Sequence, residues 1–317
     1  MRFLRACLFL FCILPAYAWN ATGHRIAAAI TYEHLTPEAR ARVDELLRQH
    51  PDYNLLVRDA PPEPEARARA AFLAAAVWPD TIRNDRRFYD EARTDAKPTP
   101  QLAGFPDMQR HTNWHYIDTP ITPDGVHAIL KPPPTALSEI ERLLLVIAKP
   151  VDDPANPSYA LPWILHVEQD LHQPLHTVSR FLKSQPMGDE GGNNVYFLPA
   201  GVEPNRRLYR TLHSLWDEAG GTDQSDANVT RTAAEITEEY SHIYGKSPRL
   251  QKDPRQWVRE GTRLARKSVY TFGLVTGSKE HPMPLPEGYL SEARRIARMQ
   301  LAAAGLRMAA MLNALLR

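Results

Sequence analysis

The segment HVEQDLHQPLH, residues 166–176, brings three potential metal ligands close together in the sequence: His166, Asp170 and His176. Apolar residues at helical spacing run through this part of the chain, so we expect a helix over residues 160–176. Because His166 and Asp170 are four residues apart, they lie on one helix face, about 6 Å from each other. They can therefore offer an imidazole nitrogen and a carboxylate oxygen to one metal ion. His172 would face away from Asp170, so we expect it behind the ligands or at the surface.

Other segments contain residues of the same types. His213 and Asp217 repeat the four-residue spacing within LHSLWD. Each of the remaining candidates follows a tryptophan within a few residues: His24 after Trp19, Asp80 in WPDTIR and His115 in WHYID. Taken alone, Asp80 would most often cap a helix or a turn, and His115 would most often be a core histidine. A whole ordered series of nitrogen and oxygen donors without a thiolate favours zinc in a catalytic site.

The first eighteen residues have the pattern of a secretory signal peptide. Arg2 and Arg5 precede an apolar stretch that is too short to span a bilayer, and Ala16-Tyr17-Ala18 matches a cleavage signal. We expect cleavage after Ala18, a secreted or periplasmic location, and one domain over residues 19–317. Cleavage frees the amine of Trp19, and this amine and the Trp19 carbonyl can then chelate a metal ion. An uncleaved anchor, with Trp19 as an ordinary aromatic residue, is the alternative.

Charge and cysteine content narrow the classes of function. Both cysteines, Cys7 and Cys12, lie in the predicted signal peptide, so the core, bound metals or both must hold the processed domain together. The chain has 38 basic and 37 acidic side chains, and loss of Arg2 and Arg5 leaves 36 against 37, a net charge of −1. Such a balance argues against a broad basic surface for nucleic acid. If phosphate is the target, metal ions must supply much of the positive charge.

Helical patterns dominate, and they predict an all-α domain. Thr36 and Pro37 mark the start of a helix that runs to Gln49. Apolar residues at 3.6-residue spacing predict further helices over residues 135–148, 160–176, 208–219, 229–244, 255–272 and 289–315. The best strand candidate is Asn194–Leu198. Residues 84–110 are charged, so we expect a solvated excursion, with a lid over the substrate as the alternative.

The ordered motifs W-N-A-T-G-H, W-P-D-x-I-R, W-H-Y-I-D, H-x-x-x-D-x-x-x-x-x-H, G-G-N-N and L-H-S-L-W-D resemble the secreted zinc-dependent single-strand nucleases of the S1/P1 family, which are related to zinc phospholipase C. The resemblance runs from Trp19 to near the C-terminus. It implies a single, mostly helical domain around three zinc ions. The absence of cysteine from residues 19–317 resembles bacterial rather than fungal or plant members, and the excursion at 84–110 is longer than expected for the family.

The resemblance also implies a ligand set for each zinc ion. One ion would be bound by Asp80, His115, His166 and Asp170. Asp170 would bridge to a second ion, which the amine and carbonyl of Trp19 and the imidazole of His24 would complete. A third, more exposed ion would be bound by His176, His213 and Asp217.

The family pattern further implies roles beyond metal binding. The catalytic residues would be Asp80, Arg83 and Asp170, with Arg83 stabilising the transition state. Tyr116 and Asp118 would stack on the base and hydrogen-bond to it. Gly191, Gly192 and Asn193 would line the phosphate site, although a plain turn is the simpler interpretation of this loop.

The implied activity is that of an endonuclease in which a zinc-activated water cleaves single-stranded DNA and RNA. The products would carry 5′-phosphates, and 3′-mononucleotides would also be hydrolysed. No stable protein partner and no membrane span are implied. Two alternatives remain open: a zinc phospholipase C, and a non-enzymatic exported zinc-binding module. Asp217, where the phospholipase pattern has glutamate, and the WHYID motif argue against the former, while Arg83 would be unexplained in the latter.

Overall fold

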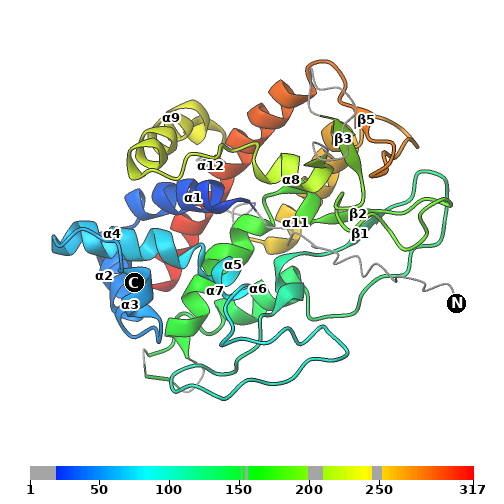
Figure 1. The fold of residues 1–317 in the computed structure, drawn as a ribbon. Helices are drawn as coiled ribbons and strands as arrows, with labels where there is room; N and C mark the ends of the chain where they lie inside the picture. The colour runs from blue at the N-terminus through cyan, green and yellow to red at the C-terminus, as the bar shows by residue number, and fades with distance from the viewer. Residues whose placement is uncertain (1–18, 151, 154–155, 199–209, 245–251) are drawn as a thin grey trace, which may run out of the picture.

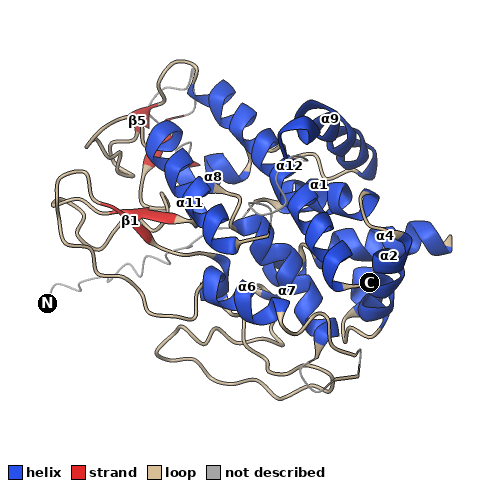
Figure 2. Ribbon diagram, turned by 180° about the vertical axis from the view of Figure 1, so that it is seen from behind, coloured by secondary structure: helices blue, strands red, loops and turns tan. Residues whose placement is uncertain are grey.

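Helices dominate the computed structural model, which describes residues 19–150, 152–153, 156–198, 210–244 and 252–317. The expected all-α class is therefore confirmed (Figure 2). The predicted signal peptide, residues 1–18, lies outside the described residues. The described α-helices are α1 (Ala21–Glu33), α2 (Pro37–Arg48), α3 (Tyr53–Leu56), α4 (Pro64–Ala75), α5 (Trp78–Ile82), α6 (Ala136–Leu144), α7 (Pro157–Asp170), α8 (Leu212–Asp217), α9 (Asp226–Tyr244), α11 (Pro254–Leu264) and α12 (Tyr289–Leu315). The shorter helical turns are η1 (Thr112–His115), η2 (Pro174–His176) and the π-helical η3 (Ala265–Val269).

Local chemistry explains where the predicted helices begin. Helix α2 starts as expected because the Thr36 hydroxyl accepts a hydrogen bond from the Ala39 amide at 3.3 Å, with Pro37 in the first turn. Helix α12 covers residues 289–315, as its apolar spacing predicts. The helix expected over 255–272 is α11, which continues as η3. None of the helices in the described part of the chain is both long enough and apolar enough to cross a membrane.

The helix predicted over residues 160–176 ends earlier than expected, at Asp170. Pro174 has no amide hydrogen to continue the helical hydrogen bonding, and the Gln173 side chain accepts a bond from the Leu175 amide at 2.6 Å. The chain then turns through η2. This break decides where His172 and His176 lie.

The core forms where α1 packs against α12, with α9 beside both (Figure 1). Helices α1 and α12 approach closely at Gly305 of α12, where a Cβ atom would lie 2.5 Å from the Cβ of Ile30. The Thr31 hydroxyl donates to the Gly305 carbonyl at 3.1 Å across the same contact. Helix α7 is buried along its whole length and also contacts both α1 and α12. Its ligand-bearing end is therefore held at the centre of the molecule.

Short strands lie at one end of the molecule, on the side of β1 and β5 in Figure 2. β1 (Thr119–Ile121) pairs in parallel with β2 (Val178–Arg180), and Thr119 is opposite Val178. A second sheet has the order β4-β3-β5, formed by β3 (Tyr196–Leu198), β4 (Arg210–Thr211) and β5 (Met283–Pro284). β3 falls within the predicted strand Asn194–Leu198. β1 comes directly after Asp118, so the pairing of β1 and β2 fixes the chain beside two predicted site residues.

The excursion over residues 84–110 is anchored to the core rather than fully solvated. Phe88, Phe105 and Met108 are buried, and the rings of Phe88 and Phe105 contact Trp78. The Tyr89 amide donates to the Met108 carbonyl at 2.9 Å, which ties the two arms of the excursion together. The buried apolar residues of this excursion are scattered among charged ones, so the high charge of the segment gave no indication that part of it packs against the core.

Candidate metal centre

Six separate elements bring the predicted ligands together. α1 carries His24, α5 carries Asp80, and η1 carries His115. α7 carries His166 and Asp170, η2 carries His176, and α8 carries His213 and Asp217. All these side chains are buried. They form three groups whose ligand atoms lie within 4.8 Å of one another: His24, Asp80 and His166; His115, His166 and Asp170; and His176, His213 and Asp217.

Asp170 stands between two sets of imidazoles. Its Oδ2 lies 3.2 Å from His115 Nδ1 and 3.3 Å from His166 Nε2. Its Oδ1 lies 3.5 Å from His24 Nε2. The two oxygens of one carboxylate therefore face different histidines. This is the placement that a bridging ligand requires.

Asp80 lies on the same cluster, opposite Asp170. Its Oδ1 is 3.8 Å from His166 Nε2 and 3.9 Å from His115 Nδ1, and its Oδ2 is 4.0 Å from His24 Nε2. Arg83 lies one helical turn away, and its Nη1 is 3.4 Å from Asp80 Oδ1. The guanidinium group thus borders the cluster without belonging to it.

The third group lies next to the first cluster, along η2 and α8. His176 Nε2 is 3.2 Å from His213 Nε2, and His213 Nε2 is 3.6 Å from Asp217 Oδ2. The Gln173 side chain donates to Asp217 Oδ1 at 2.8 Å, which leaves Oδ2 facing His213. The early end of α7 is what allows His176 to reach this group.

Hydrogen bonds orient most of the imidazoles from behind. The Nδ1 atoms of His166, His176 and His213 face the carbonyl oxygens of Ala76, His115 and Gly191 at 2.8, 2.6 and 2.8 Å. His24 Nδ1 lies 2.6 Å from Gln169 Oε1. A ring that donates through Nδ1 leaves the Nε2 lone pair toward the cluster. Each of these rings is therefore held in a ligand orientation.

Burial disfavours the charged forms of both the histidines and the aspartates in the cluster. It lowers the pKa of His24 to about 3, assisted by the neighbouring His166, and it also lowers the pKa of His166 to about 3. Burial raises the pKa of Asp170 well above its usual range, and the charges of Asp80 and Asp217 add to the effect. The buried carboxylates have neither water nor charged histidines to balance their negative charge. A bound cation would supply that balance, and the neutral imidazoles could bind it as ligands.

Trp19 is fixed beside the same elements. Its indole is buried and donates to the Gln169 carbonyl at 3.0 Å, one residue before Asp170. The amide of the next residue, Asn20, donates to the Asp217 carbonyl at 3.2 Å. The start of the described chain is therefore held between α7 and α8, both of which carry candidate ligands.

A cavity of about 160 Å³ opens next to the clusters. Predicted site residues form much of its lining: Arg83, His115, Tyr116, Asp118, His176, Gly191, Asn193 and His213. Gly192 is not part of the lining. Its φ of +82° fits the turn, and a Cβ there would meet the Leu212 side chain at 3.2 Å. Residues 84–110 are absent from the lining too, so the lid alternative has no support.

Lys131 is a cavity residue that the sequence pattern missed. Its Nζ lies 3.0 Å from the Tyr116 hydroxyl and 3.7 Å from Asp118 Oδ2, and it stands 4.8 Å above the Tyr116 ring. Burial raises the pKa of Asp118, and the positive charge of Lys131 opposes that shift. A lysine before three prolines looks like a surface connection, and only the fold brings it to the cavity.

His172 does not lie at the surface, which was one of its two expected places. It is fully buried on the far side of α7 from the clusters, where its Nε2 accepts from Arg307 Nη1 at 2.8 Å. Its Nδ1 faces the Glu168 carbonyl at 2.8 Å. His172 is thus part of a polar network behind the ligands.

The amino-acid sequence was compared with known protein families and with curated proteins. The family model of the S1/P1 Nuclease matches residues 19–317, nearly the whole chain. No curated protein matches the chain.

Proposed function

This chain belongs to the S1/P1 nuclease family, and from that premise we propose that it is an exported endonuclease that cleaves single-stranded DNA and RNA. The proposed products carry 5′-phosphates, and 3′-mononucleotides are proposed as further substrates. Export would follow cleavage after Ala18, into the periplasm or the medium. The family assignment makes the protein a nuclease, and it favours this activity over the phospholipase and the non-enzymatic alternatives.

The observation that carries the proposal is a set of three adjoining histidine and aspartate groups, two of which supply imidazoles, His115, His176 and His213, to the lining of one cavity. Members of this family depend on zinc, and the residues present fit that ion. His24 Nε2, Asp80 Oδ2 and Asp170 Oδ1 are buried without a hydrogen-bond partner among the described residues, although all three face the cluster. Nitrogen and oxygen donors in this mixture suit zinc.

We assign the proposed ligands to three ions. Asp80, His115, His166 and Asp170 would hold the first, and Asp170, His24 and the amine and carbonyl of Trp19 would hold the second. His176, His213 and Asp217 would hold the third. When bound, zinc would supply a Lewis acid that activates water and neutralises phosphate charge.

The remaining cavity residues would bind and orient the substrate. Arg83 presents a permanently charged, planar donor to the phosphate oxygens, beside Asp80. Tyr116 offers a ring on which a base can stack, while Asp118 can accept hydrogen bonds from the base edge. A base inside a duplex is paired and stacked on both faces, so this cavity would select unpaired strands. Lys131 would hold the Tyr116 hydroxyl and the Asp118 carboxylate in place.

The test compares substrates on protein processed at Trp19, with zinc content measured on the same sample. We expect cleavage of single-stranded DNA and RNA to exceed that of duplex DNA, with little hydrolysis of phosphatidylcholine. Equal rates on single strands and duplex, or faster hydrolysis of phosphatidylcholine, would contradict the proposal.

Tyr116→Ala tests the base-stacking role. Loss of a stacking contact worth about 1–3 kcal/mol per base should raise KM for single strands by roughly 5- to 150-fold. A phosphodiester that carries neither a base nor another aromatic ring should be hydrolysed as before. Tyr89→Ala, a tyrosine outside the cavity lining, is the control. Equal impairment of both substrates by Tyr116→Ala would reject this role.

A further inference from the structure

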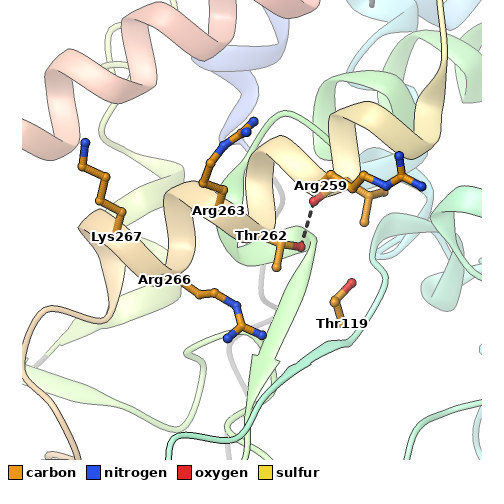
Figure 3. A pocket seen from close by; sticks show the side chains of 7 residues that line it. Thr119, Arg259, Thr262, Arg263, Arg266 and Lys267 are labelled. Atoms are coloured by element: carbon orange, nitrogen blue, oxygen red, sulfur yellow. Dashed lines mark hydrogen bonds between the residues drawn. The ribbon is translucent and has the colours of Figure 1, made fainter.

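A second concave surface lies on the outer side of α11 and η3. It is an open depression of about 520 Å³ (Figure 3). Four exposed cationic side chains line it together with Thr119, Val258 and Thr262: Arg259, Arg263, Arg266 and Lys267. Arg259 and Arg266 extend to either side of Thr262, with Thr119 facing them (Figure 3). We refer to these four cationic residues as the basic face.

No described carboxylate forms an ion pair with the basic face, although Glu292 of α12, which pairs with Arg295, lies near enough to Lys267 for the lysine to help lower its pKa. Within the described part of the chain, no acidic group lies within 4.0 Å of any of the four cationic groups, whereas Arg255, one turn earlier, pairs with Glu141 at 2.9 Å. Glu260, the one acidic residue within this stretch, pairs with Arg307 of α12 at 2.7 Å. Arg266 donates to the Pro120 carbonyl at 3.1 Å, which leaves its charge uncompensated.

The like charges of the basic face are spaced along the sequence in a way that destabilises the helix. Arg259 and Arg263 are four residues apart, as are Arg263 and Lys267, so like charges are neighbours along one side. Neighbouring like charges at this spacing destabilise an isolated helix. A bound polyanion would remove that repulsion, which a monovalent solute would do only weakly.

The basic face adjoins the cavity of the candidate metal centre. Thr119 lines the depression, and the residue before it, Asp118, lines the cavity. Since these two residues are neighbours in the chain, the two hollows lie on either side of the point where β1 begins. On α11, a Cβ at Gly261 would lie 2.6 Å from the Thr177 hydroxyl, and Thr177 directly follows His176. The helix is thus packed against the segment that carries a candidate ligand.

We propose that the basic face binds the phosphates of a single-stranded nucleic acid that extends past the nucleotides held at the metal centre. This inference rests on the proposed function. Guanidinium and ammonium groups bind phosphate oxygens strongly, and the depression has no aromatic side chain on which a base could stack. The contact therefore reads the backbone and not the sequence. It favours polynucleotides over short substrates.

The test uses the triple variant Arg259→Gln/Arg263→Gln/Lys267→Gln, which leaves the Arg266 contact with Pro120 intact. The control, Arg48→Gln/Arg58→Gln/Arg231→Gln, removes the same charge from exposed positions on other elements. Each zinc-loaded protein is assayed on a thirty-residue oligothymidylate and on the dinucleotide dTpdT over a range of salt concentrations. A charge-preserving variant, Arg259→Lys/Arg263→Lys, separates loss of charge from loss of packing.

For the oligonucleotide, we expect the triple variant to raise KM about tenfold at low salt. Its plot of log kcat/KM against log salt should become shallower by about 2, since each phosphate contact on a single strand contributes about 0.7. KM for dTpdT should stay at the value of the unmodified protein. The charge-preserving variant and the control should retain the steep salt dependence.

Other outcomes separate the inference from its premise. If the unmodified protein cleaves neither substrate, the proposed function is wrong and the inference falls with it. If it cleaves both, but the triple variant and the control behave alike, only the basic face assignment fails. Equal loss on dTpdT and the oligonucleotide also rejects it, because the change then acts on the metal centre. Loss of binding to phosphatidylserine vesicles with an unchanged oligonucleotide KM would assign the surface to anionic lipid instead.

Discussion

Asp170 is the residue on which the proposed metal centre depends most. Its two carboxylate oxygens face different imidazoles, so a single change affects both parts of the cluster. Asp217 is peripheral by comparison: the Gln173 side chain donates to Oδ1, and Oδ2 faces His213 within the third group. The same chemical substitution at the two positions therefore compares a shared carboxylate with one that serves a single group.

We expect Asp170→Asn to reduce kcat more than Asp217→Asn does. Residues behind metal ligands typically contribute about 10- to 100-fold to activity or metal affinity, so a shared ligand should contribute more than 100-fold. Metal analysis should show that Asp170→Asn loses about two zinc ions per chain, and that Asp217→Asn loses at most one. Equal loss of activity by two variants that both keep three ions would contradict the bridging role.

His50 gives a pH dependence that is separate from the metal ligands. It is buried between Trp78, Phe105 and Tyr159, and burial lowers its pKa from 6.5 to about 4. Because the folded protein holds this histidine neutral, its contribution to stability is present above pH 6.5. That contribution is lost as the pH falls from 6.5 towards 4, by about 1.4 kcal/mol per pH unit.

The measurement is the free energy of unfolding of the unmodified protein and of His50→Gln, from pH 7.5 to 4.5. The difference between the two should shrink as the pH falls, because only the histidine gains a proton on unfolding. Other titrating groups affect both proteins and cancel in the difference. A difference that does not change with pH would contradict the assignment.

At the scale of elements, sequence periodicity predicted helices with one exposed face, such as α12, and also α7, which is buried along its whole length. α12 was predicted over residues 289–315, because apolar residues recur on the side that faces the core. α1 was not predicted, because it is buried on nearly all sides and its alanines and threonines show no clear period. α7 ends at Asp170 because Pro174 interrupts it, and the chain beyond was wrongly extended as helix. The ligands themselves were recognisable from motifs, since their chemistry limits each position to a few residue types.

The surroundings of the ligands could not be predicted in the same way. Lys131 reaches the cavity from a proline-rich connection, and Arg307 reaches His172 from the last helix. Both are contacts between residues far apart in the sequence, with no local pattern to mark them. The basic face could not be predicted from the sequence for a different reason. Net charge averages the whole chain and says nothing about where unpaired charges gather.

The network behind α7 should stabilise the element that presents His166 and Asp170. Arg307 donates to His172 Nε2 at 2.8 Å and to Glu260 Oε2 at 2.7 Å. It also opposes the effect of burial, which raises the pKa of Glu168 well above its usual range. We expect Arg307→Met to lower the free energy of unfolding by roughly 3 kcal/mol, because it leaves buried polar partners unpaired.

Arg298→Met is the matched control on the same helix. Arg298 pairs with Glu239 at 2.9 Å in an exposed setting, so its loss should change stability by less than about 1 kcal/mol. Arg307→Lys should recover only part of the loss, since an ammonium group cannot reproduce two directed guanidinium bonds. Chemical denaturation of the three variants decides the matter. Similar values for Arg307→Met and Arg298→Met would show that the network adds no stability.

At the scale of the whole molecule, the candidate metal centre joins elements that are far apart in the chain, from His24 to Asp217. Its ligands come from α1, α5, η1 and α7, which share one hydrophobic cluster, and from η2 and α8, which belong to a second. Residues 19–317 contain no cysteine, so no disulfide can restrain this domain. Bound ions would therefore act as the cross-links between distant segments.

We expect removal of zinc to lower the melting temperature as well as to abolish hydrolysis. An ion present at a thousand times its dissociation constant stabilises the folded state by about 4 kcal/mol, provided that it does not bind the unfolded chain. For a chain of this size, each kcal/mol shifts the melting temperature by about 2–4 °C, so the loss of the ions should lower it by roughly 10 °C or more. Without a cation, the carboxylates of Asp80, Asp170 and Asp217 remain buried beside neutral imidazoles, which is unfavourable whichever group holds the proton.

Calorimetry in excess chelator, with metal analysis on the same sample, measures the shift in melting temperature. Added zinc should restore both the melting temperature and the activity, while magnesium should restore neither. An unchanged melting curve in protein shown to be free of metal would mean that the core alone holds these elements together.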